Sequence, residues 1–129
     1  MVARPITVVE LATFLKSADA AGMSEEERQR LVDYLARNPL AGDVIEGTSG
    51  VRKVRYAKPG TGRSGGYRAI YYYYDEEVPL FVIYAYGKNQ QATLAPDQKK
   101  AATKLVDAIK ARIKADRSER ETKCPKPER

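Results

Sequence analysis

The chain has 129 residues, which is enough for one domain with a hydrophobic core and too few for two. It carries 23 Lys and Arg against 17 Asp and Glu, a net charge of +6, and it lacks histidine, which excludes Ser-His-Asp hydrolysis and HExxH zinc sites. One cysteine allows no intrachain disulfide, and no segment has the ~20 apolar residues of a membrane span, so we expect a cytoplasmic protein without a membrane partner.

The charge is distributed unevenly along the chain. Residues 1–50 contain five Lys and Arg and eight Asp and Glu, a net charge of −3, whereas residues 51–129 contain eighteen and nine, a net charge of +9. Clustered cations gain affinity for phosphates by releasing counterions. The basic half therefore favours a polyanionic partner, although charge alone leaves open a soluble protein that is merely basic.

The first half of the sequence predicts a strand followed by two helices. Residues 6–9 are β-branched and suit a short edge strand. One helical face is then predicted by the spacing of Leu11, Phe14, Leu15 and Ala18, and Gly22 ends this helix. Residues 24–27 (SEEE) form a capping box that begins a second helix, which Asn38-Pro39 terminates.

From Val51 the hydrophobic period changes from 3.6 to 2, which predicts strands over residues 51–57, 67–74 and 80–86. Alternation places Lys53 and Arg55 on one face of the first of these. Residues 58–66 form a loop and residues 75–77 a turn, so the three strands make an antiparallel meander. The third strand is almost continuously apolar and is expected at the centre of the sheet.

A last helix is predicted from Pro96, with an apolar face formed by Ala102, Leu105, Ile109 and Ile113. Residues 116–129 are almost entirely polar and are expected to be a disordered tail after a single domain of residues 1–115. The predicted order is β-α-α-β-β-β-α, an α+β fold with an antiparallel sheet flanked by helices.

A basic segment with no acidic residue spans residues 52–68 and contains Arg52, Lys53, Arg55, Lys58, Arg63 and Arg68. Seven of the nine tyrosines lie between Tyr67 and Tyr86. Cations with aromatic rings suit single-stranded RNA, because they neutralise phosphates and stack on bases. The alternatives are a solvated charged face and tyrosines that pack in the core. Alternation places Tyr72 and Tyr74 on one face and Tyr71 and Tyr73 on the other, so only one pair can face RNA.

Residues 60–65 match the pattern GxGxxG, but a strand follows them where a dinucleotide site needs a helix. We interpret these glycines as a hairpin loop that places Arg63 near a phosphate backbone.

Lysine and arginine can together cleave RNA without a metal or another cofactor. Guanidinium groups match phosphate oxygens, and a lysine among cations has a lowered pKa because a like charge disfavours the charged form. Lys53 lies between Arg52 and Arg55 in sequence and is expected opposite Arg68. It is therefore the candidate general base for attack of a 2′-hydroxyl on the adjacent phosphate.

Three segments together resemble the HigB-type toxins of the RelE superfamily: residues 38–55 (NPLAGDVIEGTSGVRKVR), 64–74 (SGGYRAIYYYY) and 86–89 (YGKN). The similarity covers roughly residues 5–113. It implies the RelE-like fold and ribosome-dependent cleavage of mRNA that arrests translation. It also implies partnership with a cognate antitoxin, expected to carry a helix-turn-helix DNA-binding domain, and with the ribosome.

The resemblance implies catalytic roles for Lys53, Arg55, Arg68 and Lys88. Relatives carry Lys-Arg where this chain has Lys88 and Asn89, and they have a base-stacking tyrosine that residues 90–94 (QQATL) lack. These departures leave the general acid unassigned. The further RNA-binding candidates are Arg52, Lys58, Arg63, Tyr72, Tyr74 and Asn89.

Two other classes of function stay open at this point. RelE-like folds also occur in toxins that inhibit DNA gyrase by binding, and a degenerate toxin would bind only RNA or its antitoxin. A basic RNA-binding module without an antitoxin is the third possibility. The dense set of cations favours the ribonuclease.

Overall fold

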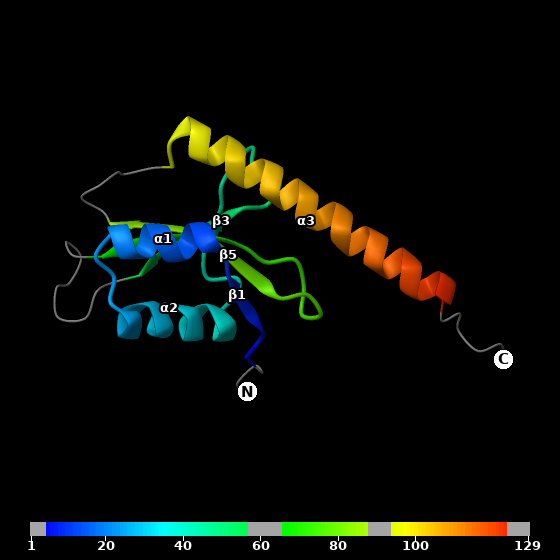
Figure 1. The fold of residues 1–129 in the computed structure, drawn as a ribbon, viewed down its shortest axis with the longest axis horizontal. Coiled ribbons are helices and arrows are strands. Elements are labelled where there is room, and N and C mark those ends of the chain that lie inside the picture. Colours follow the sequence, from blue (N-terminus) through cyan, green and yellow to red (C-terminus); the bar gives the residue numbers. More distant parts are fainter. Residues whose placement is uncertain (1–4, 57–65, 88–93, 124–129) are drawn as a thin grey trace.

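The computed structural model describes residues 5–56, 66–87 and 94–123 (Figure 1). Within these ranges lie β1 (Val8–Glu10), α1 (Ala12–Ala20), α2 (Glu25–Arg37), β2 (Asp43–Val44), β3 (Arg52–Tyr56), β4 (Tyr67–Tyr72), β5 (Leu80–Gly87) and α3 (Pro96–Lys123). The predicted α+β class is confirmed. The two-residue strand β2 is an addition, too short to show a period in the sequence.

The strands form one sheet in the order β1-β5-β4-β3-β2. Strands β3 to β5 form the predicted antiparallel meander, and β2 extends it by pairing antiparallel with β3. β1, however, runs parallel to β5, with Val8 opposite Leu80, so the expectation of a wholly antiparallel sheet is wrong at this edge. β5 is an interior strand, but the central position belongs to β4. Hydrophobic periodicity predicts a strand without specifying its neighbour, so neither the parallel pairing of β1 nor the central position of β4 could be predicted from the sequence.

Helix α1 covers the part of β5 that extends beyond β1. The Thr13 hydroxyl donates to the Ile83 carbonyl at 2.6 Å, and the Ala85 amide donates to the Ser17 hydroxyl at 2.9 Å. These bonds replace the missing strand partners of β5. The helix consequently turns Phe14 and Ala18 into the core and leaves the predicted core residue Leu15 38% exposed.

Helix α2 begins and ends where the sequence predicts. The Ser24 hydroxyl accepts from the Glu27 amide, and the Glu27 carboxylate accepts from the Ser24 amide, which completes the capping box. The helix ends at Arg37, immediately before Asn38-Pro39. These local signals fix the length of α2 and hence the point at which the chain turns toward β2.

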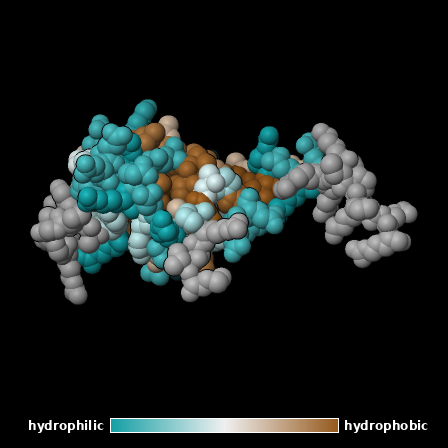
Figure 2. Space-filling view, turned by 90° about the horizontal axis from the view of Figure 1, so that it is seen from below, coloured by the Kyte–Doolittle hydropathy of each residue, from teal (hydrophilic) through white to brown (hydrophobic). Residues whose placement is uncertain are grey.

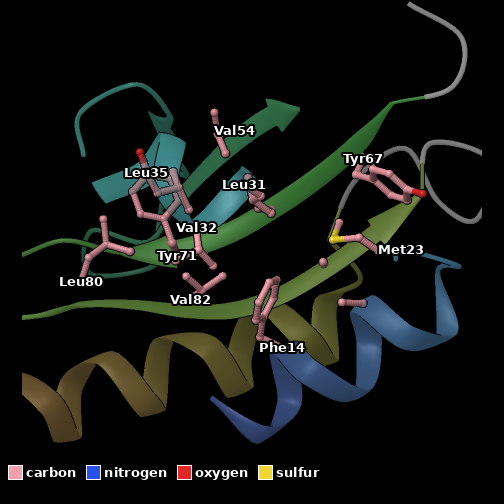
Figure 3. Close-up of a cluster of buried hydrophobic side chains, with 13 residues drawn as sticks. Phe14, Met23, Leu31, Val32, Leu35, Val54, Tyr67, Tyr71, Leu80 and Val82 are labelled. Atoms are coloured by element: carbon pink, nitrogen blue, oxygen red, sulfur yellow. The ribbon is translucent and has the colours of Figure 1, made fainter. Parts of the chain in front are cut away.

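Helices cover both faces of the sheet. α1 and α2 lie against one face, where Figure 3 shows the tight cluster of side chains from these helices, β4 and β5. The buried members include Phe14, Leu31, Leu35, Tyr71, Leu80 and Val82. α3 lies against the other face, over a second cluster that includes Val51, Ile70, Tyr72, Ile83, Tyr86 and Val106. The predicted apolar side of α3 is confirmed, with Val106 in addition.

A β-bulge interrupts β5 at Ile83. Ile70 pairs with Tyr84 but the next residue, Tyr71, pairs with Val82, so Ile83 is an extra residue on β5. Because side chains alternate along a strand, one extra residue reverses the facing of everything that follows. Val82 packs against α1 and α2, whereas Tyr84 and Tyr86 lie on the α3 face.

The Tyr71 hydroxyl fastens the segment after α2 to the sheet. It donates to the Pro39 carbonyl at 2.8 Å and accepts from the Gly42 amide at 2.8 Å, and the side chain is fully buried. A Cβ atom on residue 42 would come within 2.8 Å of the Tyr71 ring and of the Lys53 carbonyl, so only glycine fits here. This contact positions β2 and β3.

The predicted disordered tail is wrong for residues 116–123, which continue α3 past the end of the sheet (Figure 1). Arg117 pairs with Asp75 at 2.7 Å and with Glu77 at 3.7 Å, and its guanidinium lies 5.3 Å from the centre of the Tyr74 ring. The β4–β5 turn thus anchors the C-terminal part of α3 through Arg117, a long-range contact that amino-acid composition does not predict. Residues 124–129 lie outside the described ranges.

Tyr71→Phe is expected to destabilise the protein by about 1–3 kcal/mol, because it leaves the buried Gly42 amide without its acceptor. Tyr73→Phe, half-buried on the same face, is the matched control and should change the free energy of unfolding by less than ~0.5 kcal/mol. Denaturant unfolding measures both. Equal effects of the two substitutions would contradict the role assigned to Tyr71.

The Arg117–Asp75 ion pair that anchors α3 is expected to weaken in acid. The Arg117 guanidinium lowers the pKa of Asp75 below its ordinary 3.8, so the contribution is complete at neutral pH and is lost as pH falls through that lowered pKa. The protection factors of amides in residues 110–119, which correct for the intrinsic pH dependence of exchange, should therefore fall below pH 3.8, and in Arg117→Ala at neutral pH. Exchange that is unchanged in Arg117→Ala would show that other contacts hold the helix.

Candidate RNA-cleavage site

Three residues from three adjacent strands form a row on the α3 face of the sheet. Arg55 on β3 lies directly opposite Arg68 on β4, and Arg68 lies directly opposite Tyr86 on β5. Side chains at such positions have Cβ atoms roughly 5 Å apart. We call Arg55, Arg68 and Tyr86 the polar row. It brings together two of the predicted catalytic residues and adds a tyrosine that sequence reasoning missed.

Lys53 is two residues before Arg55 and on the same face, next to the row. It pairs with Ile70, so the expectation that it lies opposite Arg68 is wrong; Arg55 occupies that place. Lys53 and Arg68 are diagonal neighbours, roughly 7–8 Å apart at their backbones. The predicted grouping of Lys53, Arg55 and Arg68 on one face is confirmed, with Arg68 crowded chiefly by Arg55.

Arg52 belongs to the opposite face. Its Nη1 atom donates to the Gly42 carbonyl at 2.7 Å, beside the Tyr71 bridge. The proximity of Arg52 to Lys53 in sequence therefore does not make them neighbours on the sheet surface. Arg52 supports the turn before β2, and the geometry gives it no place among the RNA-binding residues.

The polar row passes from solvent into the protein interior. Arg55 is exposed, Arg68 is half-buried and Tyr86 is only 3% exposed. Two atoms of the row, Arg68 Nη1 and the Tyr86 hydroxyl oxygen, are buried without a hydrogen-bond partner among the described residues. Burial raises the pKa of Tyr86, and the Arg68 charge opposes that effect in part. The Tyr86 hydroxyl therefore keeps its proton at neutral pH and is a hydrogen-bond donor.

The two tyrosines predicted to stack on RNA lie under or against α3. Tyr72 is 3% exposed, with Lys110 Nζ 5.9 Å from the centre of its ring, and burial raises its pKa to about 12. A stacking role for Tyr72 is wrong for this arrangement because α3 covers the ring. Tyr74 is 37% exposed, but Arg117 lies against its ring. The predicted alternation itself is confirmed, since Tyr71 and Tyr73 pack on the α1–α2 side.

Four predicted site residues, Lys58, Arg63, Lys88 and Asn89, lie outside the described residues. Lys88 follows directly on β5, two residues after Tyr86. Within the described ranges, no group of three or more Asp, Glu, His or Cys side chains is arranged to hold a metal ion, and no helix is long and apolar enough to span a membrane.

The structure also has apolar features, and the first of them adjoins the cations, because Ile70 in its lining pairs with Lys53. A pocket of about 240 Å³ between α1, β5 and α3 is lined by Thr13, Ile70, Ile83, Tyr84, Leu94, Gln98, Ala101, Ala102 and Leu105. Seen from the side of α2, the molecule also exposes a hydrophobic area flanked by hydrophilic surface (Figure 2). Exposed apolar surface of this kind suits contact with another protein rather than with phosphates.

The model of a protein family described as "RelE toxin of RelE / RelB toxin-antitoxin system" matches residues 7–121 of this chain. The match covers most of the sequence, including the row, the Tyr71 bridge and α3 beyond residue 115. It confirms the expected superfamily. The narrower assignment to HigB-type toxins stays a prediction.

Arg52 and Lys53 are adjacent and equally charged, and their opposite facing can be tested without an activity assay. Arg52→Ala is expected to destabilise the protein by about 1–2 kcal/mol because it removes the hydrogen bond to Gly42. Lys53→Ala should change stability by less than ~0.5 kcal/mol. Thermal or urea unfolding of the two variants measures the difference; the reverse ranking would contradict the assigned faces.

Proposed function

This chain belongs to the RelE family of toxins, the toxin components of toxin–antitoxin systems, and on that premise we propose that it is an endoribonuclease that cleaves mRNA on the ribosome. The observation that carries the proposal is the placement of Lys53, Arg55 and Arg68 in adjacent positions on one sheet face. Cleavage would arrest translation. We place the protein in the HigB-type branch, on the three segments of sequence that resemble it.

We propose that the reaction proceeds without a metal: side chains of this chain act as base and stabilise the phosphate, and the donor that protonates the leaving 5′-oxygen stays unassigned. The 2′-hydroxyl of a nucleotide loses its proton to a base, and its oxygen attacks the adjacent phosphorus. The bond from phosphorus to the 5′-oxygen then breaks, leaving a 2′,3′-cyclic phosphate on one fragment and a 5′-hydroxyl, after protonation, on the other. We assign the base to Lys53, which reaches the same surface as the two arginines.

Arg55 and Arg68 suit the second requirement, which is stabilisation of the charge that develops on the phosphate oxygens. Guanidinium groups donate in a planar fork that matches two such oxygens, and donors fixed in place before the reaction need no reorganisation. Their direct cross-strand pairing brings two positive charges to one phosphate. Lys88, the residue that follows β5 in the sequence, is the further catalytic candidate.

An antitoxin is the partner that membership of this family entails. We propose that this antitoxin carries a helix-turn-helix DNA-binding domain and that an acidic segment of it covers the basic half of the toxin, which has a net charge of +9 over residues 51–129. The ribosome and its message are the other proposed partners, and both are located in the cytoplasm.

The test is inducible expression in a bacterium with mapping of mRNA 5′ ends on translated messages. Wild-type protein should produce cuts within codons, and Arg68→Ala or Lys53→Ala should reduce them at least ~100-fold, the usual cost of losing one group that stabilises the transition state. Arg30→Ala, an exposed arginine on α2 remote from the row, is the control of equal charge and should cut normally.

The outcomes separate the classes of function. Cuts that persist in Arg68→Ala would remove the sheet face from the mechanism. Growth arrest without any cuts would refute the ribonuclease and favour a toxin that acts by binding, as the gyrase inhibitors do.

A further inference from the structure

The polar row contains two hydrogen-bond donors that the described protein leaves unused. Arg68 Nη1 and the Tyr86 hydroxyl are both buried, both lack a partner among the described residues, and belong to directly opposed residues on β4 and β5. An unpaired buried donor costs free energy, and a fold seldom places two in neighbouring positions. An acceptor that reached both donors would remove both penalties together.

The surroundings specify the chemistry of that acceptor. Arg55 lies directly opposite Arg68, and two like charges at such positions repel each other. An anion between or above the two guanidinium groups is attracted to both, and this attraction offsets their mutual repulsion. A tetrahedral oxyanion has oxygens enough to accept from two guanidinium groups and a hydroxyl at once, which a carboxylate or a chloride ion does not match as well.

We propose that Arg68 and Tyr86 form the floor of a phosphate-binding site, in which the Tyr86 hydroxyl donates to a phosphate oxygen that Arg55 and Arg68 also hold. The inference deepens the proposed function, on which it rests for identifying this group as the scissile phosphate of RNA. Tyr86 is thereby a further residue that contacts the substrate.

The gradient of exposure along the row is suited to this role. Arg55 is exposed and meets the incoming phosphodiester, half-buried Arg68 continues the path, and buried Tyr86 lies at its inner end. Because burial raises the pKa of Tyr86, its hydroxyl stays protonated and donates throughout the physiological range. A third cation at this inner position would add repulsion to the Arg55–Arg68 pair, whereas a neutral hydroxyl adds a donor without charge.

The first arm of the test measures binding of inorganic phosphate, the probe, to the purified protein at constant ionic strength, by NMR titration of the Arg68 side chain. Wild-type protein should bind phosphate with a shift at Arg68 Nε–H, and Tyr86→Phe should bind at least tenfold more weakly. Tyr84→Phe is the control from the same strand and face; it loses the bond to Gln98 but should keep wild-type affinity for phosphate.

The unfolding midpoint without phosphate provides an independent signature. Tyr86→Phe removes an oxygen that has no hydrogen-bond partner in the described part of the chain, so the variant should be as stable as wild type or more stable. Tyr84→Phe should be less stable. A variant that is stable and yet impaired in binding cannot be explained by misfolding.

The second arm is mRNA cleavage by the same variants, in which Tyr86→Phe should cut at least tenfold more slowly than Tyr84→Phe. Wild-type phosphate affinity or wild-type cleavage in Tyr86→Phe would overturn the inference, as would the absence of any shift at Arg68 in the wild type. If phosphate binds through Arg68 and Tyr86 but no message is cut, the phosphate-binding site is supported as a site for free phosphate, and the proposed ribonuclease activity is refuted.

Discussion

The register across β3, β4 and β5 is the constraint on which the rest of the site depends. It sets Arg55 against Arg68 and Arg68 against Tyr86, so three side chains distant in sequence share one row. The helices on the two faces of the sheet then determine which of its side chains stay accessible. α1 and α2 bury the apolar core residues of the opposite face, and α3 covers the apolar part of the near face, so the charged residues lie on a sheet that is packed on both sides.

Stability and function make opposite demands on this sheet. Opposed arginines and unpartnered buried donors both destabilise a fold, and local rules are typically broken at functional sites. Elsewhere the same strands satisfy their polar groups closely. Tyr71 makes two hydrogen bonds at 2.8 Å, Arg52 closes on Gly42, and Thr13 and Ser17 complete the edge of β5. Among the described residues, Arg68 and Tyr86 thus stand out on these strands as opposed residues that each carry a buried donor atom without a partner.

Features that depend on near neighbours in sequence could be predicted, and those that depend on long-range contacts could not. The Ser24–Glu27 capping box and the shared face of Lys53 and Arg55 are local and were predictable. The facing of Tyr86 depends on the bulge at Ile83, which no period reveals, because simple alternation from Leu80 would turn Tyr86 toward α1 and α2. The prediction that Tyr72 stacks on RNA failed because α3 covers its ring. The sequence did not predict the C-terminal end of α3 because Arg117 there pairs with Asp75, which lies 42 positions earlier in the chain.

The parallel pairing of β1 with β5 has a consequence for how the protein is made. Residues 8 and 80 are neighbours in the sheet, so the first strand waits unpaired until most of the chain has been synthesised. The polar row is completed by Tyr86, later still. A growing chain accordingly carries its cations without their final arrangement until synthesis has passed β5.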